Sequence, residues 1–198
     1  MNYILVLVMA GMPLTLGELL TRFFGLQREL ARKFVHVLGG LVAALLVLLF
    51  TSQEIMIVVI YTPIMILVRK HLRSEIKSLY GVARTSYGEV VFPLGVGISA
   101  TFSPNEERYI AAMLILGISD TLASLVGDRW PIWRVSIFSS TRSLGGSGAF
   151  ALSAFVICLA TGLGVNEAVS VALATTVIEA LSIRGFDNAT VPIIAVLA

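Results

Sequence analysis

One stretch decides the fold of this chain: residues 117–130 read G-I-S-D-T-L-A-S-L-V-G-D-R-W. It closes an apolar segment that begins at Tyr109, and it places Asp120 eleven residues inside that segment. A carboxylate surrounded by hydrocarbon costs on the order of a few kcal/mol, so an ionisable residue at such depth indicates a functional site. Because Gly127 and Asp128 then end the segment, we predict a membrane helix whose neighbours supply Asp120 with a partner.

A polar link and a glycine-rich turn follow this segment. The link contains Arg129, Arg134 and Arg142, and residues 140–149 read S-T-R-S-L-G-G-S-G-A just before the next apolar run. The unpaired backbone N–H groups and the dipole at a helix start favour anions. The turn is a weak signal on its own, and it does not match the G-x-x-x-x-G-K-[ST] phosphate loop, which argues against a soluble P-loop mechanism.

The composition indicates an integral membrane protein. Hydrophobic residues make up 57% of the chain and charged residues 13%, with a mean hydropathy of +0.93, whereas soluble domains contain about 25% charged residues. We therefore predict an all-α membrane helix bundle in which residues 1–198 form one domain without a soluble part. The first apolar run has no basic leader or cleavage site, so it reads as a retained span. Cys158 is the lone cysteine, which excludes a disulfide within the chain.

Seven apolar runs read as helical spans, and an eighth begins near residue 189. The seven runs cover residues 3–21, 35–51, 55–68, 89–102, 109–127, 147–163 and 168–183. The eighth run reaches about half a bilayer, as a half-helix, an interfacial segment or a span whose continuation is missing. Pro93, Gly95 and Gly97 make the short fourth run a candidate for a broken or re-entrant helix.

The positions of the cations predict the topology, because cytoplasmic connections are enriched in Lys and Arg. Of the 14 Lys and Arg residues, all but Arg108 fall on alternate connections. This places the N-terminus outside and the basic connections in the cytoplasm. It also brings six polar residues to the cytoplasmic halves of their spans or just beyond: Glu18, His36, Glu89, Asp120, Glu179 and Asp187. We expect any chemistry to occur at that face.

The motif R-K-F-V-H-V-L-G-G starts at Arg32 and offers donors for a phosphate. Arg32 and His36 share a helix face at the i, i+4 spacing, with Lys33 beside them. The simpler interpretation is that the cations are membrane anchors and that His36 is a structural, hydrogen-bonded residue. Glu89 opens the fourth run, where it could serve a site or only complement the helix dipole.

The carboxylates are candidate metal ligands. A magnesium–phosphate complex would offset the cost of burying Asp120, whereas Ala123 and Gly127 on the same helix face indicate only close packing. Asp128 is either a second ligand or a solvated charge at the helix end. Further along, Glu179 lies about a turn inside the seventh span, and two polar residues follow it that could bind metal or cap the last helix: Asp187 and Asn188.

Taken together, these segments resemble the CTP-dependent polyprenol kinase family, which includes phytol kinases, dolichol kinases and CTP-using diacylglycerol kinases. The matching motifs follow one another in the family's order between residues 32 and 192: R-K-F-V-H-V-L-G-G, D-T-L-A-S-L-V-G, R-S-L-G-G-S-G-A and E-A-L-S-I-R-G-F-D-N-A-T-V-P. The resemblance implies a kinase that moves the terminal phosphate of a nucleoside triphosphate, typically CTP, to the hydroxyl of an isoprenoid or other lipid alcohol.

Carried over residue by residue, the family's important positions fall on Arg32, Lys33, Asp120 and Gly127. Further motif positions are Ser143, Gly146, Ser147, Glu179, Asp187 and Asn188. The chain departs from the family where Arg142 and Gly145 replace the usual lysine and glutamate. It also departs where Asp128, Arg129 and Trp130 stand in place of a frequent second glycine. Arginine binds phosphate with different geometry from lysine, and the missing glutamate bears on donor choice or metal binding.

We therefore expect a triphosphate to be held by cations and by the glycine-rich turn, with Mg²⁺ on some of the carboxylates. The expected nucleotide contacts are Arg32, Lys33, His36, Gly127, Arg142, Ser143, Gly146 and Ser147, and the expected metal ligands are Asp120, Asp128, Glu179 and Asp187. The lipid alcohol enters sideways from the membrane lipid, and Asp120 accepts its proton. No nucleic-acid partner is expected, a homo-oligomer stays open, and the localisation is a prokaryotic cell membrane.

Two other functions fit the same residues. A cytidylyltransferase would use these polar groups to make a CDP-lipid from a lipid phosphate. A small membrane transporter or assembly subunit would use intramembrane acids to relay ions. Against this second alternative, the acids gather at one face and do not line a path across the bilayer.

Overall fold

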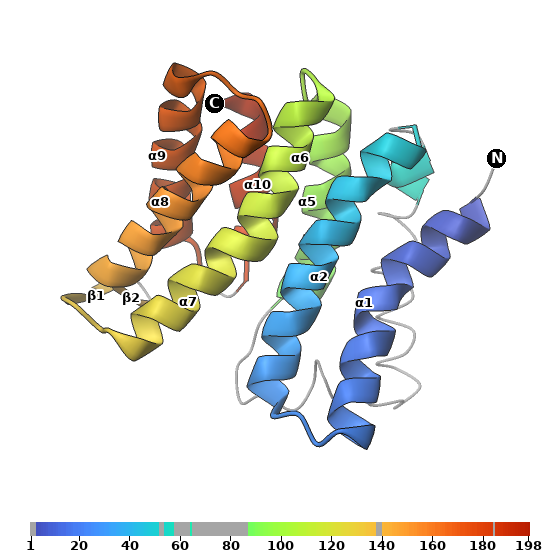
Figure 1. Ribbon diagram of the computed structural model, residues 1–198, viewed down its shortest axis with the longest axis horizontal. Coiled ribbons are helices and arrows are strands. Elements are labelled where there is room, and N and C mark those ends of the chain that lie inside the picture. The colour runs from blue at the N-terminus through green and yellow to red at the C-terminus, as the bar shows by residue number, and fades with distance from the viewer. Residues whose placement is uncertain (1–2, 52–53, 58–63, 65–86, 138–139, 184) are drawn as a thin grey trace.

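The structure, a computed structural model, describes residues 3–51, 54–57, 64, 87–137, 140–183 and 185–198 (Figure 1). Helices account for most of these residues, with one two-stranded sheet. The elements are α1 (Tyr3–Phe23), α2 (Arg28–Leu49), α5 (Gly88–Phe102), α6 (Glu106–Leu114), the π-helical turn η1 (Ile115–Ser119), α7 (Asp120–Arg129), β1 (Arg134–Ile137), β2 (Ser140–Ser143), α8 (Leu144–Ala160), α9 (Val165–Leu181) and α10 (Asp187–Leu197).

The apolar runs that fall within the described residues become helices, as predicted. Within the described residues, three helices are long and apolar enough to cross a membrane: Ile4–Phe23, Arg28–Leu49 and Glu106–Arg129, the last of which joins α6, η1 and α7. Shorter apolar helices cover Val90–Phe102, Leu144–Ala160 and Asp187–Leu197. The third predicted run, 55–68, lies mostly outside the described residues. A mostly helical fold with membrane-type helices is therefore confirmed, whereas a membrane bundle of seven or eight spans with an outside N-terminus stays a prediction.

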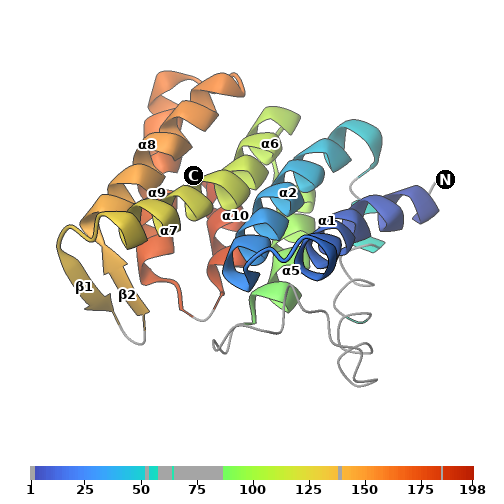
Figure 2. The same cartoon turned by 60° about the horizontal axis from the view of Figure 1, so that its bottom comes forward.

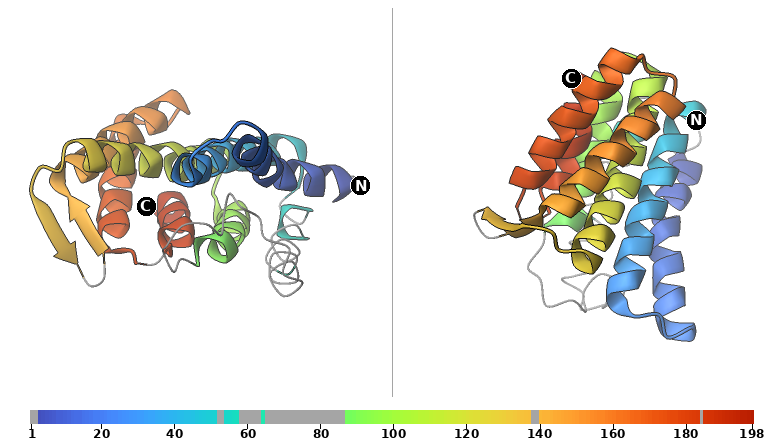
Figure 3. Two further views of the ribbon diagram at one scale, coloured as in Figure 1. Left: turned by 90° about the horizontal axis from the view of Figure 1, so that it is seen from below. Right: turned by 60° about the vertical axis from the view of Figure 1, so that its left-hand side comes forward.

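The helices are arranged in layers around the central helix α6–α7. Seen from below in Figure 3, α5, α9 and α10 lie side by side against a layer that contains α1, α2 and α7, while α8 packs against both α7 and α9. Tyr109, Met113 and Phe150 are among the largest fully buried side chains. The Tyr109 hydroxyl donates to the Ala43 carbonyl oxygen at 3.0 Å, so the central helix is tied to α2 as well as packed on it.

A glycine contact brings α2 unusually close to the central helix. A Cβ at Gly40 would lie 2.7 Å from the Met113 carbonyl oxygen and 2.8 Å from the Cα of Gly117. Only glycine permits this approach, in the way that small residues do at membrane helix crossings. Because His36 lies one turn before Gly40, the crossing fixes the distance between His36 and the helix that contains Asp120.

The central helix changes its winding immediately before Asp120. In the π-helical turn η1, the Asp120 N–H donates to the carbonyl oxygen of Ile115, five residues earlier, and Thr121 Oγ1 donates to the Gly117 carbonyl oxygen at 2.8 Å. Such π-turns inside α-helices are frequent at functional sites. The wider turn rotates Asp120 relative to the face that regular α-helical spacing predicts.

The polar link between the fifth and sixth runs forms an antiparallel hairpin, which the sequence analysis did not predict. Arg134 pairs with Ser143 and Ile137 with Ser140. Figure 2 shows the hairpin reaching out of the bundle between α7 and α8. Trp133, which precedes β1, adopts a positive φ of 44° and has 79% of its surface exposed.

The fourth run corrects one expectation. The helix α5 is continuous from Gly88 to Phe102 with Pro93 inside it, so it is not broken. A Cβ at Gly95 would lie 2.3 Å from the Asn188 carbonyl oxygen, which shows that this glycine serves close packing of α5 on α10. The last helix, α10, has 11 residues and is about 16 Å long at the usual helical rise, which leaves the three interpretations of the eighth run open.

Candidate functional site

The centre of the candidate site is a pair formed by His36 and Asp120. His36 Nε2 lies 3.3 Å from Asp120 Oδ2 and 2.9 Å from the Leu116 carbonyl oxygen. Because a carbonyl oxygen can only accept a hydrogen bond, Nε2 must be the protonated ring nitrogen. The ring of Phe92 contacts His36 edge-on, with 5.9 Å between the ring centroids. The bundle thus gives Asp120 a polar partner, and the Asp120 side chain keeps 22% of its surface exposed.

A second group of contacts surrounds Arg142, at the end of β2. Arg142 Nη1 lies 2.6 Å from Glu179 Oε1, and Nη2 lies 3.3 Å from Asp187 Oδ2. Nη2 also donates to the Ser182 carbonyl oxygen at 3.4 Å. Glu179 is only 1% exposed, so this guanidinium supplies the positive charge that a buried carboxylate needs. The arginine joins the hairpin to the end of α9 and the start of α10.

The two groups belong to one electrostatic cluster. Asp120 interacts with the charges of Arg142 and Arg32 in addition to that of His36. Asp187 interacts with Asp120, Arg142 and His36, and Glu179 with Arg142, Asp120 and Asp187. We call these six residues the polar cluster: Arg32, His36, Asp120, Arg142, Glu179 and Asp187. Residues from four separate sequence motifs therefore meet at one place.

Two buried polar atoms beside the cluster have no hydrogen-bond partner among the described residues. They are Nε of Arg142 and Oγ of Ser119, which directly precedes Asp120. Unsatisfied buried polar atoms are rare in native proteins, and a bound ligand or ion is one explanation for them. An N–H donor on a guanidinium is suited to a phosphate oxygen, since charge-assisted hydrogen bonds of this kind are strong.

The carboxylates fit Mg²⁺ only in a restricted way. In the part of the chain that the structure describes, no three His, Cys, Asp or Glu side chains are arranged to hold a metal ion. Magnesium is usually held by one or two carboxylates together with substrate phosphates, which does not require such a group. Asp120, Glu179 and Asp187 supply carboxylate oxygens of this type within the polar cluster.

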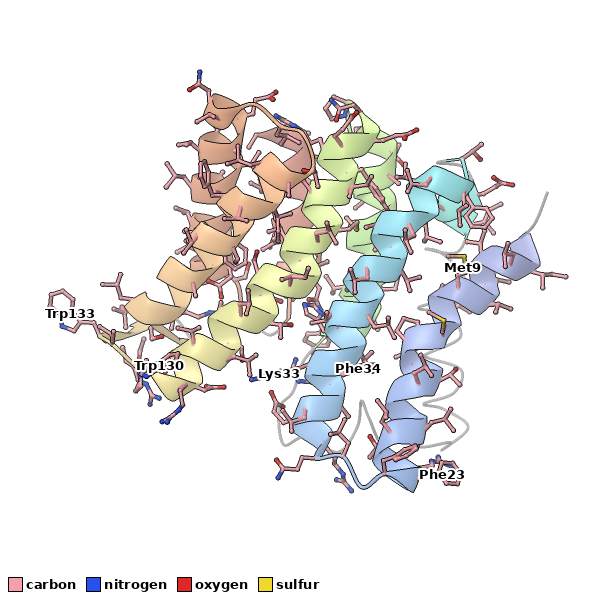
Figure 4. All side chains as sticks on the ribbon, viewed as in Figure 1. Met9, Phe23, Lys33, Phe34, Trp130 and Trp133 are labelled. Carbon is pink, nitrogen blue, oxygen red and sulfur yellow. The ribbon has the colours of Figure 1, made fainter. Side chains whose placement is uncertain are left out.

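The predicted ligand Asp128 lies elsewhere. Its Oδ2 is 3.3 Å from Lys33 Nζ, which joins α7 to α2, and its side chain is 75% exposed. The Lys33 side chain is only 10% exposed, and it extends from α2 toward α7 (Figure 4). The pair therefore stands at the rim of the site, and it places one cation of the R-K-F-V-H motif near the end of α7. Arg32 forms its own bond with Glu29, Nη2 to Oε1 at 2.7 Å.

The glycine-rich turn starts α8 and holds it against α7. Ser143 is the N-cap, and its Oγ accepts a hydrogen bond from the Gly146 N–H at 3.1 Å. A Cβ at Gly146 would lie 2.7 Å from the Ala123 carbonyl oxygen, and one at Gly127 would lie 2.9 Å from Ser143 Oγ. Both glycines thus permit the close contact that keeps Arg142 near Asp120. Ser147 lies in the first turn of α8, which begins at Leu144, three residues before the predicted run.

Asn188 ties the start of α10 to the start of α5. Its Nδ2 donates to the Gly88 carbonyl oxygen at 3.0 Å, and its backbone N–H donates to Asp187 Oδ1 at 3.0 Å. Asn188 therefore positions the Asp187 carboxylate, while the N-cap of α10 is Phe186. Glu89 belongs to the first turn of α5, and its side chain lies outside the described residues.

Sequence reasoning missed several contacts of the site. The Leu116 and Ser182 carbonyl oxygens bond His36 and Arg142, and backbone acceptors leave no signal in residue types. The contact of Phe92 with His36 joins two helices far apart in the chain. Ser182 Oγ and Thr190 Oγ1, 2.9 Å apart, bridge the ends of α9 and α10. Of these contacts, only the one between Ser182 and Thr190 could have been predicted, because the two hydroxyl residues lie on either side of the Gly185 turn in the sequence.

Fold and site together define a class: a helical protein with membrane-type helices and a cluster of acids, a histidine and arginines at one end of the bundle. Its sequence is similar to that of a phytol kinase from Synechocystis sp. The two are 28% identical over 194 residues, which cover 92% of this chain and 83% of the relative. No family model matches the chain, and no solved structure matches it.

Proposed function

We propose that this protein is a membrane kinase that transfers the terminal phosphate of a nucleoside triphosphate to the hydroxyl of an isoprenoid alcohol. The observation that carries the proposal is the polar cluster, in which the His36–Asp120 pair shares one electrostatic environment with Arg142 and its two carboxylates. The similarity to a phytol kinase over most of the chain supports an isoprenoid alcohol as the acceptor. The family resemblance makes CTP the expected donor.

In this proposal Asp120 is the proton acceptor. The alcohol oxygen forms a bond to the terminal phosphorus while the bond from that phosphorus to the bridging oxygen breaks, and the nucleoside diphosphate leaves. The proton of the alcohol passes to a carboxylate oxygen of Asp120. The Nε2–H group of His36 holds the carboxylate in place through the 3.3 Å contact, as a base must be positioned by a neighbour to act in general base catalysis.

The arginines and the glycine-rich turn are proposed to bind the phosphates. Phosphoryl transfer depends mainly on positioning and on neutralising charge. Arg142 offers a buried Nε–H without a partner among the described residues, and Arg32 and Lys33 add positive charge from α2. Ser143, Gly146 and Ser147 begin α8, where the helix dipole favours an anion. Gly127 contributes by letting α7 approach that turn.

Magnesium is proposed to bind through one or two of the carboxylates Asp120, Glu179 and Asp187, together with the phosphates. The ion would neutralise phosphate charge in the way usual for phosphoryl transfer. Asp128 remains a proposed ligand at the rim of the site, because its contact with Lys33 involves Oδ2 and its side chain is 75% exposed.

We propose that the site faces the cytoplasm, where the nucleotide is dissolved, and that the N-terminus lies outside. The cations of α2, α7 and the hairpin lie at the same end as the polar cluster, and the Arg108–Glu167 pair, 3.1 Å apart, belongs to the connections at the other end. Seven or eight spans in a prokaryotic cell membrane complete this proposal. A homo-oligomer remains open.

The test is transfer of label from CTP carrying radioactive phosphorus in its terminal phosphate. Purified protein in lipid nanodiscs, supplied with Mg²⁺ and a C20 isoprenoid alcohol, should move the label into the lipid. Label found in pyrophosphate after addition of the lipid phosphate would instead establish the cytidylyltransferase. Absence of label both from every lipid and from pyrophosphate, with all four nucleotides tested, would leave the transporter or assembly subunit as the better interpretation.

The same assay tests the role of Asp120. Asp120→Asn should lower kcat by about 100-fold or more, since a positioned base contributes on that scale, while the melting temperature stays close to that of the wild type. Glu167→Gln is the matched control, because it makes the same chemical change at the other end of the bundle. Full activity of Asp120→Asn would remove this residue from the mechanism.

A further inference from the structure

An apolar cavity lies between α1, α2 and α5. Its volume is ≈ 60 Å³, and the residues that line it within the described part of the chain are all apolar. Ala10 lines it from α1, Gly39 and Ala43 from α2, and Phe92 and Val96 from α5. An apolar lining of this kind favours hydrocarbon over water.

Phe92 connects this cavity to the His36–Asp120 pair. The same ring that lines the cavity contacts the His36 ring edge-on, with a centroid distance of 5.9 Å. Gly39 lies three residues after His36. Its lack of a side chain makes room for the Phe92 ring, because a Cβ at Gly39 would lie 3.2 Å from Phe92 Cζ. The cavity is therefore linked to the proposed proton acceptor, Asp120, through two side chains in contact, Phe92 and His36.

We propose that this cavity holds the branched hydrocarbon next to the hydroxyl of the acceptor alcohol, which means its first isoprene units. The inference rests on the proposed kinase function and names the part of the substrate that the protein recognises. Phe92 contacts His36, and His36 contacts Asp120, so a chain that extends from a hydroxyl at Asp120 along these two side chains enters the cavity. The cavity is far smaller than the roughly 300 Å³ of a pocket that encloses a whole ligand. The rest of the tail accordingly lies between helices and in lipid.

The size of the cavity also gives a reason for selectivity. The alanines at its wall, Ala10 and Ala43, are small enough to leave room for methyl branches, and the described lining offers no polar side chain to a bound chain. Selection then depends on the shape of the first carbon atoms and not on total chain length. An isoprenoid alcohol should be preferred over a straight-chain alcohol of equal carbon number.

The first experiment fills the cavity from α1, a helix that contributes no member of the polar cluster. Ala10→Phe should lower kcat/KM for a C20 isoprenoid alcohol at least tenfold and leave kcat/KM for a straight-chain alcohol of equal carbon number within twofold. Val8→Phe is the matched control on the same helix, because Val8 is 62% exposed and does not line the cavity. If Ala10→Phe lowers both substrates equally, or neither, the inference is wrong.

The second experiment needs neither a variant nor turnover. A C15 isoprenoid alcohol with a photoreactive diazirine in its second isoprene unit is irradiated with the wild-type protein, and labelled peptides are identified by mass spectrometry. Label on residues 39–46 or 92–96, removed by excess C20 isoprenoid alcohol but not by a straight-chain alcohol, supports the inference. Label that phospholipid or the straight-chain alcohol removes equally well would show a general lipid-filled gap and overturn it.

The two failures can be told apart. If the wild type phosphorylates no alcohol but the diazirine probe labels the cavity specifically, the kinase proposal fails and the cavity remains an isoprenoid site. If the wild type is active but neither experiment involves the cavity, only this inference fails. Ala10→Leu serves as the smaller filling should Ala10→Phe not fold, and the same substrate pattern is expected from it.

Discussion

At the scale of single residues, Arg142 holds more of the site together than any other described side chain. It contacts Glu179 and Asp187 with its two terminal nitrogens and still has one buried donor without a described partner. In the family that the chain resembles, a lysine is usual at this position. Lysine is a compact point charge, whereas the arginine fork can serve several acceptors at once, and here it serves carboxylates on both sides of the α9–α10 turn.

Removing this guanidinium should therefore destabilise the protein. Arg142→Met leaves Glu179 buried without a partner, and breaking a buried ion pair from one side costs about 3–5 kcal/mol. The melting temperature in detergent should fall accordingly. Arg142→Met combined with Glu179→Gln should recover much of the stability but no activity, since the phosphate donor stays absent. If the double variant is no more stable than Arg142→Met alone, the arginine does not stabilise the fold by neutralising Glu179.

The residue types of the site could be predicted from sequence, but their pairing could not. Depth in an apolar run singled out Asp120, and the i, i+4 rule put Arg32 and His36 on one face. The sequence does not show which face of one helix packs against which face of another. That His36 bonds Asp120 while Lys33 bonds Asp128 follows from how α2 crosses the central helix.

At the scale of elements, that crossing depends on Gly40 and Gly117. Gly40→Ala should destabilise the protein by about 1–3 kcal/mol, the usual cost of overpacking, because the new Cβ would meet backbone atoms that cannot rotate away. The variant should also lose activity, since His36 moves with α2. Gly11→Ala on α1 is the matched control, because a Cβ there meets nothing within 4 Å. Equal melting temperatures for the two variants would contradict the close crossing.

The hairpin is the element that sequence reasoning missed, for a physical reason. Its strands have four residues each and contain serine, threonine and arginine, so they lack the long apolar alternation that predicts a strand. The π-helical turn before Asp120 was missed likewise, because hydrogen-bond spacing within an apolar helix leaves no compositional trace. The bounds of the helices were easier to predict than these two elements. The run predicted at 109–127 corresponds to the continuous helix Glu106–Arg129, which joins α6, η1 and α7.

The hairpin also allows a prediction about its environment. Trp130 and Trp133 are the two tryptophans of the chain, and both are exposed at the start of the hairpin. Because tryptophan prefers the membrane interface, we expect their fluorescence in nanodiscs to be quenched more by spin labels near the lipid headgroups than by labels deep in the bilayer. Trp133→Phe should remove part of this signal. Stronger quenching by an aqueous quencher such as iodide would place the hairpin in water.

At the scale of the whole molecule, the two ends of the bundle differ in charge. One end gathers the polar cluster and the hairpin, including Arg134, while the Arg108–Glu167 pair belongs to the other. A kinase that uses a cytoplasmic nucleotide requires the first end to face the cytoplasm. The positive-inside rule makes the same demand independently, so the orientation is a joint test of topology and function.

Thiol labelling in intact cells measures this orientation. Cys158, the lone native cysteine, is buried in α8, so a Cys158→Ala chain gives a clean background. A membrane-impermeant maleimide should label Glu167→Cys in whole cells and label Arg134→Cys only after the cells are opened. Both positions have exposed side chains, so the difference would report the side of the membrane and not burial. The reverse pattern would put the polar cluster outside, where a cytoplasmic nucleotide cannot reach it, and would defeat the kinase proposal as a whole.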